Sequence, residues 1–184
     1  LMGFRPESMD ASVRDFLGEL GNMIVGNAKN ELSGDMRYHL STPGLIVGKK
    51  HVLSTLSQYP AIRISFSSPA GPVDTVLFIS EVLAKTGKLA DLSQNPLENM
   101  GFVEPIFSAT TRIFSDFLGI QVKEKSINVR NPLTPKFDVT AFLGISNETM
   151  EGQVILNMSG KLALHIYQKL LGETLEELNE QVRD

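Results

Sequence analysis

Residues 15–27 read DFLGELGNMIVGN, a stretch that combines the apolar pattern of a helix with an acid, an amide and three glycines. At about 100° per residue, apolar side chains fall within one broad arc of such a helix: Val13, Leu17, Leu20 and Ile24. A polar stripe follows the opposite side through Asp15, Glu19, Asn22 and Gly26. We therefore expect a helix over residues 10–32, with one buried face and one polar face.

Three glycines border the polar stripe: Gly18, Gly21 and Gly26. Each interior glycine lowers helix stability by roughly 1 kcal/mol relative to alanine. Glycine also lacks the side chain that would keep another backbone away. A solvated polar face is the plain interpretation of the stripe, but it does not account for three glycines. An open surface that a partner approaches closely accounts for them better, and we interpret them as partner-approach glycines.

The composition is that of an ordinary globular protein. The chain has 184 residues, of which 42% are hydrophobic and 21% charged, with a formal net charge of −4. No basic cluster is interleaved with aromatic residues, which argues against a nucleic-acid partner. No apolar run approaches the roughly 20 residues of a membrane span, and residues 1–8 lack a signal-peptide core. We expect a cytoplasmic protein that does not bind membranes.

The rest of the chain predicts an α+β fold. We expect an extended segment at 37–48, strands at 61–68, 73–82, 120–129, 137–146 and 151–159, and helices at 102–119 and 160–172. The order is αβββ followed by αβββα, with a polar linker at 85–101. Hairpin-length connections favour an antiparallel sheet with helices packed over one face.

The two ends of the chain resemble each other. LMGFRPESMDASVRD, residues 1–15, aligns without a gap to LLGETLEELNEQVRD, residues 170–184, with six identical positions. Internal repeats of this kind indicate that the chain is one period of a tandem array with a short overlap. Chance similarity is the alternative explanation for so short an alignment.

The sequence SVRDFLGELGNMIVGNAKNEL (12–32), followed by LSTPGLIVG (40–48), resembles the CheC/CheX/FliY family of chemotaxis phosphatases, and CheX most closely. The family signature is Asp or Ser, three residues, Glu, two residues, Asn, and then Pro after about twenty residues. Asp15, Glu19, Asn22 and Pro43 match it. Residues 104–122, 139–159 and 163–180 also follow the order of that family.

The order of the two halves departs from the family. Residues 1–84 resemble the C-terminal half of CheX, which carries the motif helix, and residues 102–184 resemble the N-terminal half. We therefore expect the two halves, joined by the linker at 85–101, to form one CheX-like domain that is circularly permuted or derived from a tandem repeat. Exchange of halves between two chains is the alternative.

The resemblance implies a phosphatase that removes the aspartyl phosphate of a CheY-type response regulator. It implies that Asn22 orients the attacking water, that Glu19 pairs with a lysine of the regulator, and that Asp15 and Pro43 support the motif. The regulator supplies Mg²⁺, so no cofactor or metal is expected on this chain. Related proteins imply a homodimer. A non-catalytic module that binds a response regulator or a flagellar switch component is the alternative function.

A second motif is absent from the other half. The corresponding helix has Glu104 followed three residues later by Phe107. A phenyl ring cannot replace a carboxamide, so we expect one active site per chain.

Overall fold

The computed structural model describes residues 11–32, 37–48, 61–81, 100–130, 135–148 and 150–171. Its elements are α1 (Ala11–Glu31), β1 (His39–Leu40), β2 (Gly44–Val47), β3 (Ala61–Ser68), β4 (Gly71–Glu81), α2 (Met100–Arg112), the π-helical turn η3 (Ile113–Phe117), β5 (Lys123–Arg130), β6 (Val139–Ser146), β7 (Met150–Met158) and α3 (Gly160–Leu171). The predicted helices and strands are confirmed. The predicted linker lies outside the described residues, except that its last two residues begin α2.

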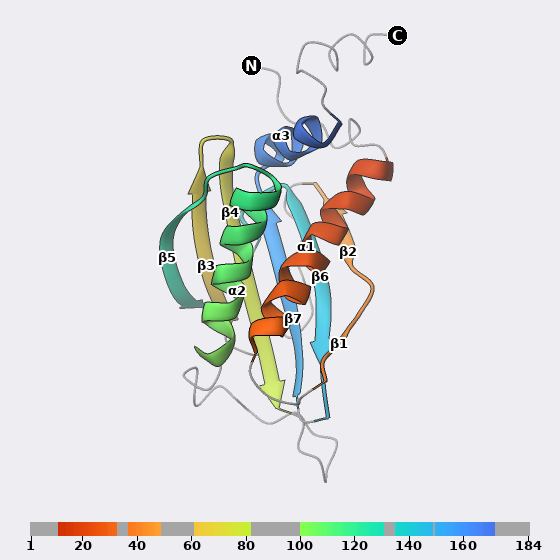
Figure 1. The fold of residues 1–184 in the computed structure, drawn as a ribbon, viewed down its shortest axis with the longest axis vertical. Coiled ribbons are helices and arrows are strands. Elements are labelled where there is room, and N and C mark those ends of the chain that lie inside the picture. Colours follow the sequence, from red (N-terminus) through yellow and green to blue (C-terminus); the bar gives the residue numbers. More distant parts are fainter. Residues whose placement is uncertain are drawn as a thin grey trace.

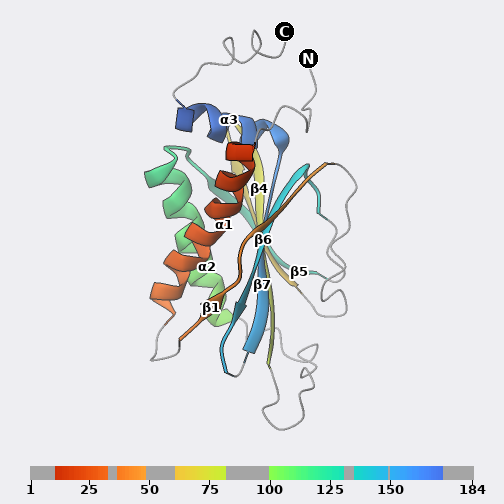
Figure 2. The ribbon, with the colours of Figure 1, turned by 90° about the vertical axis from the view of Figure 1, so that its right-hand side faces the viewer.

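All seven strands join one antiparallel sheet in the order β1-β6-β7-β4-β3-β5, and β2 also pairs with β6. The outer strands are exchanged between the halves of the chain, because β2 pairs with β6 whereas β5 pairs with β3. Figures 1 and 2 show α1 and α2 side by side on one face of the sheet, with α3 across one end. This arrangement confirms the predicted α+β class.

The β3–β4 hairpin fixes the position of α3. Its turn at Pro69 and Ala70 ends at Gly71, where φ is +143°, a value that side chains strongly disfavour. The Gly71 amide donates to Ser68 Oγ at 3.1 Å, and the Ser68 hydroxyl donates to Gly71 O at 2.7 Å. A Cβ on Gly71 would collide with Ser159 Oγ, because the start of α3 lies directly against the turn. Glycine is therefore required here.

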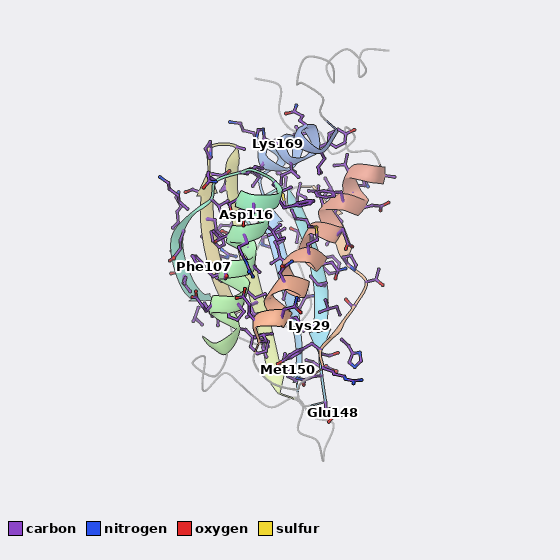
Figure 3. The ribbon with its side chains drawn as sticks, viewed as in Figure 1. Lys29, Phe107, Asp116, Glu148, Met150 and Lys169 are labelled. Atoms are coloured by element: carbon purple, nitrogen blue, oxygen red, sulfur yellow. The ribbon has the colours of Figure 1, made fainter. Side chains whose placement is uncertain are left out.

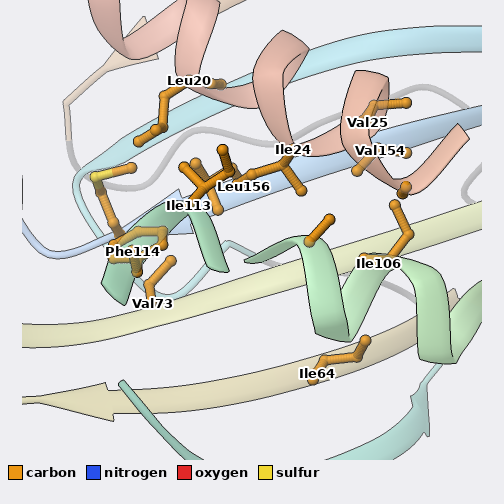
Figure 4. Packing of buried hydrophobic residues seen from close by; sticks show 14 of the residues in the cluster. Leu20, Ile24, Val25, Ile64, Val73, Ile106, Ile113, Phe114, Val154 and Leu156 are labelled. Carbon is orange, nitrogen blue, oxygen red and sulfur yellow. The ribbon is translucent and has the colours of Figure 1, made fainter. Parts of the chain in front are cut away.

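The main core lies between the sheet and the helices (Figure 4). The expected apolar arc of α1 is fully buried there, at 3% exposure or less: Val13, Leu17, Leu20 and Ile24. Facing it are alternate residues of the strands, including Ala141 and Leu143 of β6 and Val154 and Leu156 of β7. Each buried valine, leucine or isoleucine contributes about 1.5–3 kcal/mol. This burial holds α1 in a fixed orientation, with its other face outward.

The opposite face of the sheet buries polar groups. Arg63 of β3 and Asp74 of β4 form an ion pair at 3.5 Å, and both side chains are almost inaccessible. Beside them, Asn157 Oδ1 accepts hydrogen bonds from the amides of Lys136 and Phe137 at 2.9 and 3.0 Å. Asn157 thereby holds in place the backbone of Lys136 and Phe137, which lead into β6.

No helix in the described ranges combines the length and the apolar character needed to cross a membrane.

Candidate functional site

The outward face of α1 carries the predicted polar stripe. Asp15 and Glu19 are exposed, whereas Asn22 and Gly26 are half-buried. The apolar arc on the other side of the helix is buried, so the stripe cannot turn inward. The predicted division of α1 into two faces is confirmed.

Glu19 and Asn22 contact each other on this face. The Asn22 amide nitrogen donates to both carboxylate oxygens of Glu19, at 3.2 Å to Oε1 and 3.3 Å to Oε2. Residues three apart on a helix are surface neighbours, so the backbone of α1 is enough to bring them together. Among the described residues, neither side chain has another hydrogen-bond partner. The free Asn22 oxygen and the Glu19 carboxylate together form an exposed acceptor pair.

Pro43 lies against the same helix. A Cβ built on Gly18 would lie 3.6 Å from Pro43 Cβ, so the proline ring packs directly over Gly18, next to Glu19 in the sequence. The segment that carries Pro43 is held by Ser41, whose Oγ accepts from the Gly144 amide at 2.7 Å and whose own amide donates to Gly144 O at 3.0 Å. The structure thus brings Pro43 to the helix of Glu19 and Asn22.

The interpretation of the glycines needs correction. Gly18 and Gly21 are buried inside the protein. A Cβ on Gly21 would lie 3.5 Å from Leu143 Cδ2 and 3.9 Å from Ala141 Cβ, both on β6. Gly18 and Gly21 therefore face Pro43 and the sheet, where an added Cβ would make ordinary contacts, and they do not open a surface for a partner. Only Gly26, with nothing within 4 Å of an added Cβ, stays a candidate for that role.

The second helix over the sheet has a different surface. Glu104 of α2 is exposed like Glu19, but Phe107 stacks on Phe66 of β3, with ring centroids 5.6 Å apart and an interplanar angle of 23°. Figure 3 labels Phe107 on the side of α2 toward β3. α2 therefore has an acid, Glu104, at the position that corresponds to Glu19. At the position that corresponds to Asn22 it has a packed aromatic ring, Phe107.

An ion pair joins α1 and α2. Arg112 of α2 pairs with Glu31 near the end of α1, and Ser108 Oγ donates to the same carboxylate at 3.4 Å. Local sequence pattern could not predict this contact or the Ser41–Gly144 bond, because each joins residues far apart in the chain. Within the described ranges, no group of three or more His, Asp or Glu side chains could hold a metal ion. The source of Mg²⁺ stays a prediction.

The first 67 residues match a family model described as chemotaxis phosphatase CheX. The fold is similar to that of FliY from Thermotoga maritima, with a TM-score of 0.56 and 16% identity over 90% of this chain and 99% of that one. CheX from Vibrio vulnificus gives a TM-score of 0.54 and 12% identity over 77% and 99% of the two chains. FliM from H. pylori, in a structure of the FliM–SpeE complex, gives 0.50 and 13% over 93% and 98%.

No protein of curated function matches the chain. The resemblance to the CheC/CheX/FliY family is confirmed by the family model, which covers α1 and Pro43, and by the fold of the described chain. At these low identities, the structural similarity shows the fold alone. The permuted order of the two halves stays a hypothesis.

Proposed function

We propose that this protein is a phosphatase that hydrolyses the aspartyl phosphate of a CheY-type response regulator. The observation that carries the proposal is the hydrogen-bonded pair of Glu19 and Asn22 on the outward face of α1. Both residues lie in the segment that matches the chemotaxis phosphatase CheX model.

The chemistry suits a site with few groups. An aspartyl phosphate is an activated acyl phosphate, so its hydrolysis requires mainly a positioned water and electrostatic support. A carboxamide can both donate and accept hydrogen bonds, which allows Asn22 to orient the attacking water in line with phosphorus. The regulator supplies the phosphorylated aspartate and Mg²⁺.

Glu19 binds the regulator through an ion pair with a lysine. Its carboxylate is exposed and has no positive partner among the described residues, so a cation on the regulator can reach it. Asp15, one turn earlier, adds negative charge to the same stripe. Pro43 supports the helix from the side, since it packs over Gly18. Action on a response regulator places the protein in the cytoplasm, where we propose that it forms a homodimer.

The direct test is release of inorganic phosphate from phosphorylated response regulators of the same genome, with and without the protein. We expect at least one regulator to lose phosphate faster in the presence of the protein. A regulator that binds the protein but keeps its phosphate at the intrinsic rate would contradict the proposal.

That outcome would favour the alternative, a non-catalytic module that binds a regulator or a flagellar switch component. The similarity of fold to FliM supports this second candidate, since the same scaffold occurs there over 93% of the chain. The outward-facing amide of Asn22 favours the phosphatase, because binding alone does not require a carboxamide at that position.

A further inference from the structure

We propose that Glu19 has a second role that rests on the phosphatase function: it is a positioning residue that sets the orientation of the Asn22 amide. The two ends of an asparagine side chain differ chemically, because Nδ2 only donates hydrogen bonds and Oδ1 only accepts them. Which end faces the water decides whether Asn22 can assist its attack.

The orientation follows from the partner. An ionised carboxylate can only accept hydrogen bonds, so the end of Asn22 that faces Glu19 must be Nδ2. The structure has this arrangement, with Nδ2 at 3.2 and 3.3 Å from the two carboxylate oxygens. Oδ1 is consequently directed away from Glu19, and none of the described residues donates to it.

This orientation is the productive one for hydrolysis. The attacking water must present a lone pair to phosphorus. A donating Nδ2 would compete for that lone pair, whereas an accepting Oδ1 binds a hydrogen of the water and leaves the lone pair free. An exposed amide without a partner rotates between both orientations, because the torsion that turns it has broad, roughly two-fold minima. Glu19 removes the unproductive orientation before the regulator arrives.

A neighbouring charge helps to keep Glu19 directed at Asn22. Asp15 lies four residues before Glu19 on the same stripe, and like charges at this spacing repel each other. Asn27 shows the contrast, because its Nδ2 donates at 2.8 Å to the backbone oxygen of Met23 and needs no side chain to hold it. The orientation of Asn22 therefore depends on one replaceable carboxylate.

The carboxylate can serve both roles at once. Its two oxygens offer about four acceptor sites, of which the Asn22 amide uses only part. A lysine of the regulator can bind the remaining sites without displacing Asn22. The ion pair acts on binding, whereas the amide orientation acts on the chemical step, so the two roles affect different kinetic parameters.

The test compares Glu19→Gln with Glu19→Ala in single-turnover loss of phosphate, over a range of protein concentrations. Glutamine keeps an acceptor oxygen for Asn22 but has no charge for the lysine. We expect Glu19→Gln to raise the half-saturating concentration about tenfold and to keep the maximal rate within about threefold. We expect Glu19→Ala to lower the maximal rate by a further tenfold or so.

The matched controls are Glu104→Gln and Glu104→Ala on α2, where Phe107 takes the place of the amide; neither should change either parameter. A readout in the free protein is the NMR signal of the side-chain amides. The Asn22 signals should move in Glu19→Ala and stay near their wild-type positions in Glu19→Gln, while those of Asn27 stay fixed in both variants.

Equal maximal rates for Glu19→Gln and Glu19→Ala would overturn the positioning role and leave the phosphatase proposal intact. Asn22 amide signals that do not respond to Glu19→Ala would overturn it as well. If the wild-type protein fails to accelerate hydrolysis of any regulator, both the positioning role and the proposed function are overturned.

Discussion

Helices α1 and α2 cover the same face of the same sheet, yet they present different side chains at corresponding positions. α1 precedes strands β1 to β4, α2 precedes strands β5 to β7, and each helix exposes a glutamate, Glu19 or Glu104. Three residues further on, α1 has the outward amide of Asn22, whereas α2 has Phe107 stacked on Phe66. A single position therefore distinguishes α1, whose Asn22 we propose positions a water, from α2, whose Phe107 packs on the sheet.

The two helices also differ in their neighbours. Gly21 of α1 faces Leu143 and Ala141 of β6, and Gly18 faces Pro43. α2 is instead followed by the π-helical turn Ile113–Phe117. Just beyond that turn, Lys169 Nζ donates a hydrogen bond to Gly119 O. The helix that carries Glu19 and Asn22 is therefore packed from two sides, by β6 and by Pro43.

The largest expected effect comes from removing the carboxamide of Asn22, which α2 lacks at the corresponding position. Asn22→Ala should lower the single-turnover rate on the order of 10²-fold, about 3 kcal/mol, because the water loses its positioning group. Affinity for a beryllofluoride-activated regulator and the melting temperature should change little, since Asn22 lies outside the core. Asn27→Ala is the control on the same helix, and wild-type hydrolysis by Asn22→Ala would remove the chemical distinction between the helices.

The second prediction concerns the packing role of α2. Phe107→Ala should destabilise the protein by about 2 kcal/mol, because it removes a partly buried ring and its stack on Phe66. The rate of phosphate release at a temperature well below unfolding should not change. Urea unfolding followed by circular dichroism measures the first effect. A loss of activity in the folded variant would show that α2 takes part in the site.

Gly26 tests whether any glycine of α1 serves a partner. Gly26→Ala should stabilise the free protein by up to about 1 kcal/mol, since the helix gains propensity and an added Cβ meets nothing within 4 Å. If a regulator approaches this point closely, its affinity should fall while the melting temperature rises. Unchanged affinity would leave Gly26 without a role in binding.

The smallest expected effect is at the contact between the helices. Glu31→Gln should lower stability by no more than about 0.5 kcal/mol, because the Glu31–Arg112 pair is largely exposed and screened by solvent. Its effect should shrink further at high salt, which can be checked by melting in 0.05 and about 1 M NaCl. A loss well above 1 kcal/mol would mean that the ion pair fixes the angle between α1 and α2.

The sequence predicted those features that depend on local pattern. The apolar arc from Val13 to Ile24 placed Glu19 and Asn22 on the outward face, because helical periodicity alone decides which side is buried. The same reasoning failed for Gly18 and Gly21, since their neighbours Pro43 and Leu143 are brought in by strand pairing. The π-helical turn inside the predicted helix at 102–119 was also missed, because no residue there marks it.

The exchange of outer strands has a consequence for how the protein is made. Leu45 of β2 pairs with Ala141 of β6, so the sheet beneath the motif helix is completed only after β6 has been synthesised, long after α1. Such non-local pairing slows folding, and until it forms, the apolar arc of a newly made α1 stays open to chaperones or to other chains. If synthesis stops before β6, Glu19 and Asn22 lie on a helix that lacks the strand it packs against. Chains that stop before β6 should therefore be degraded, and they should lack the proposed activity.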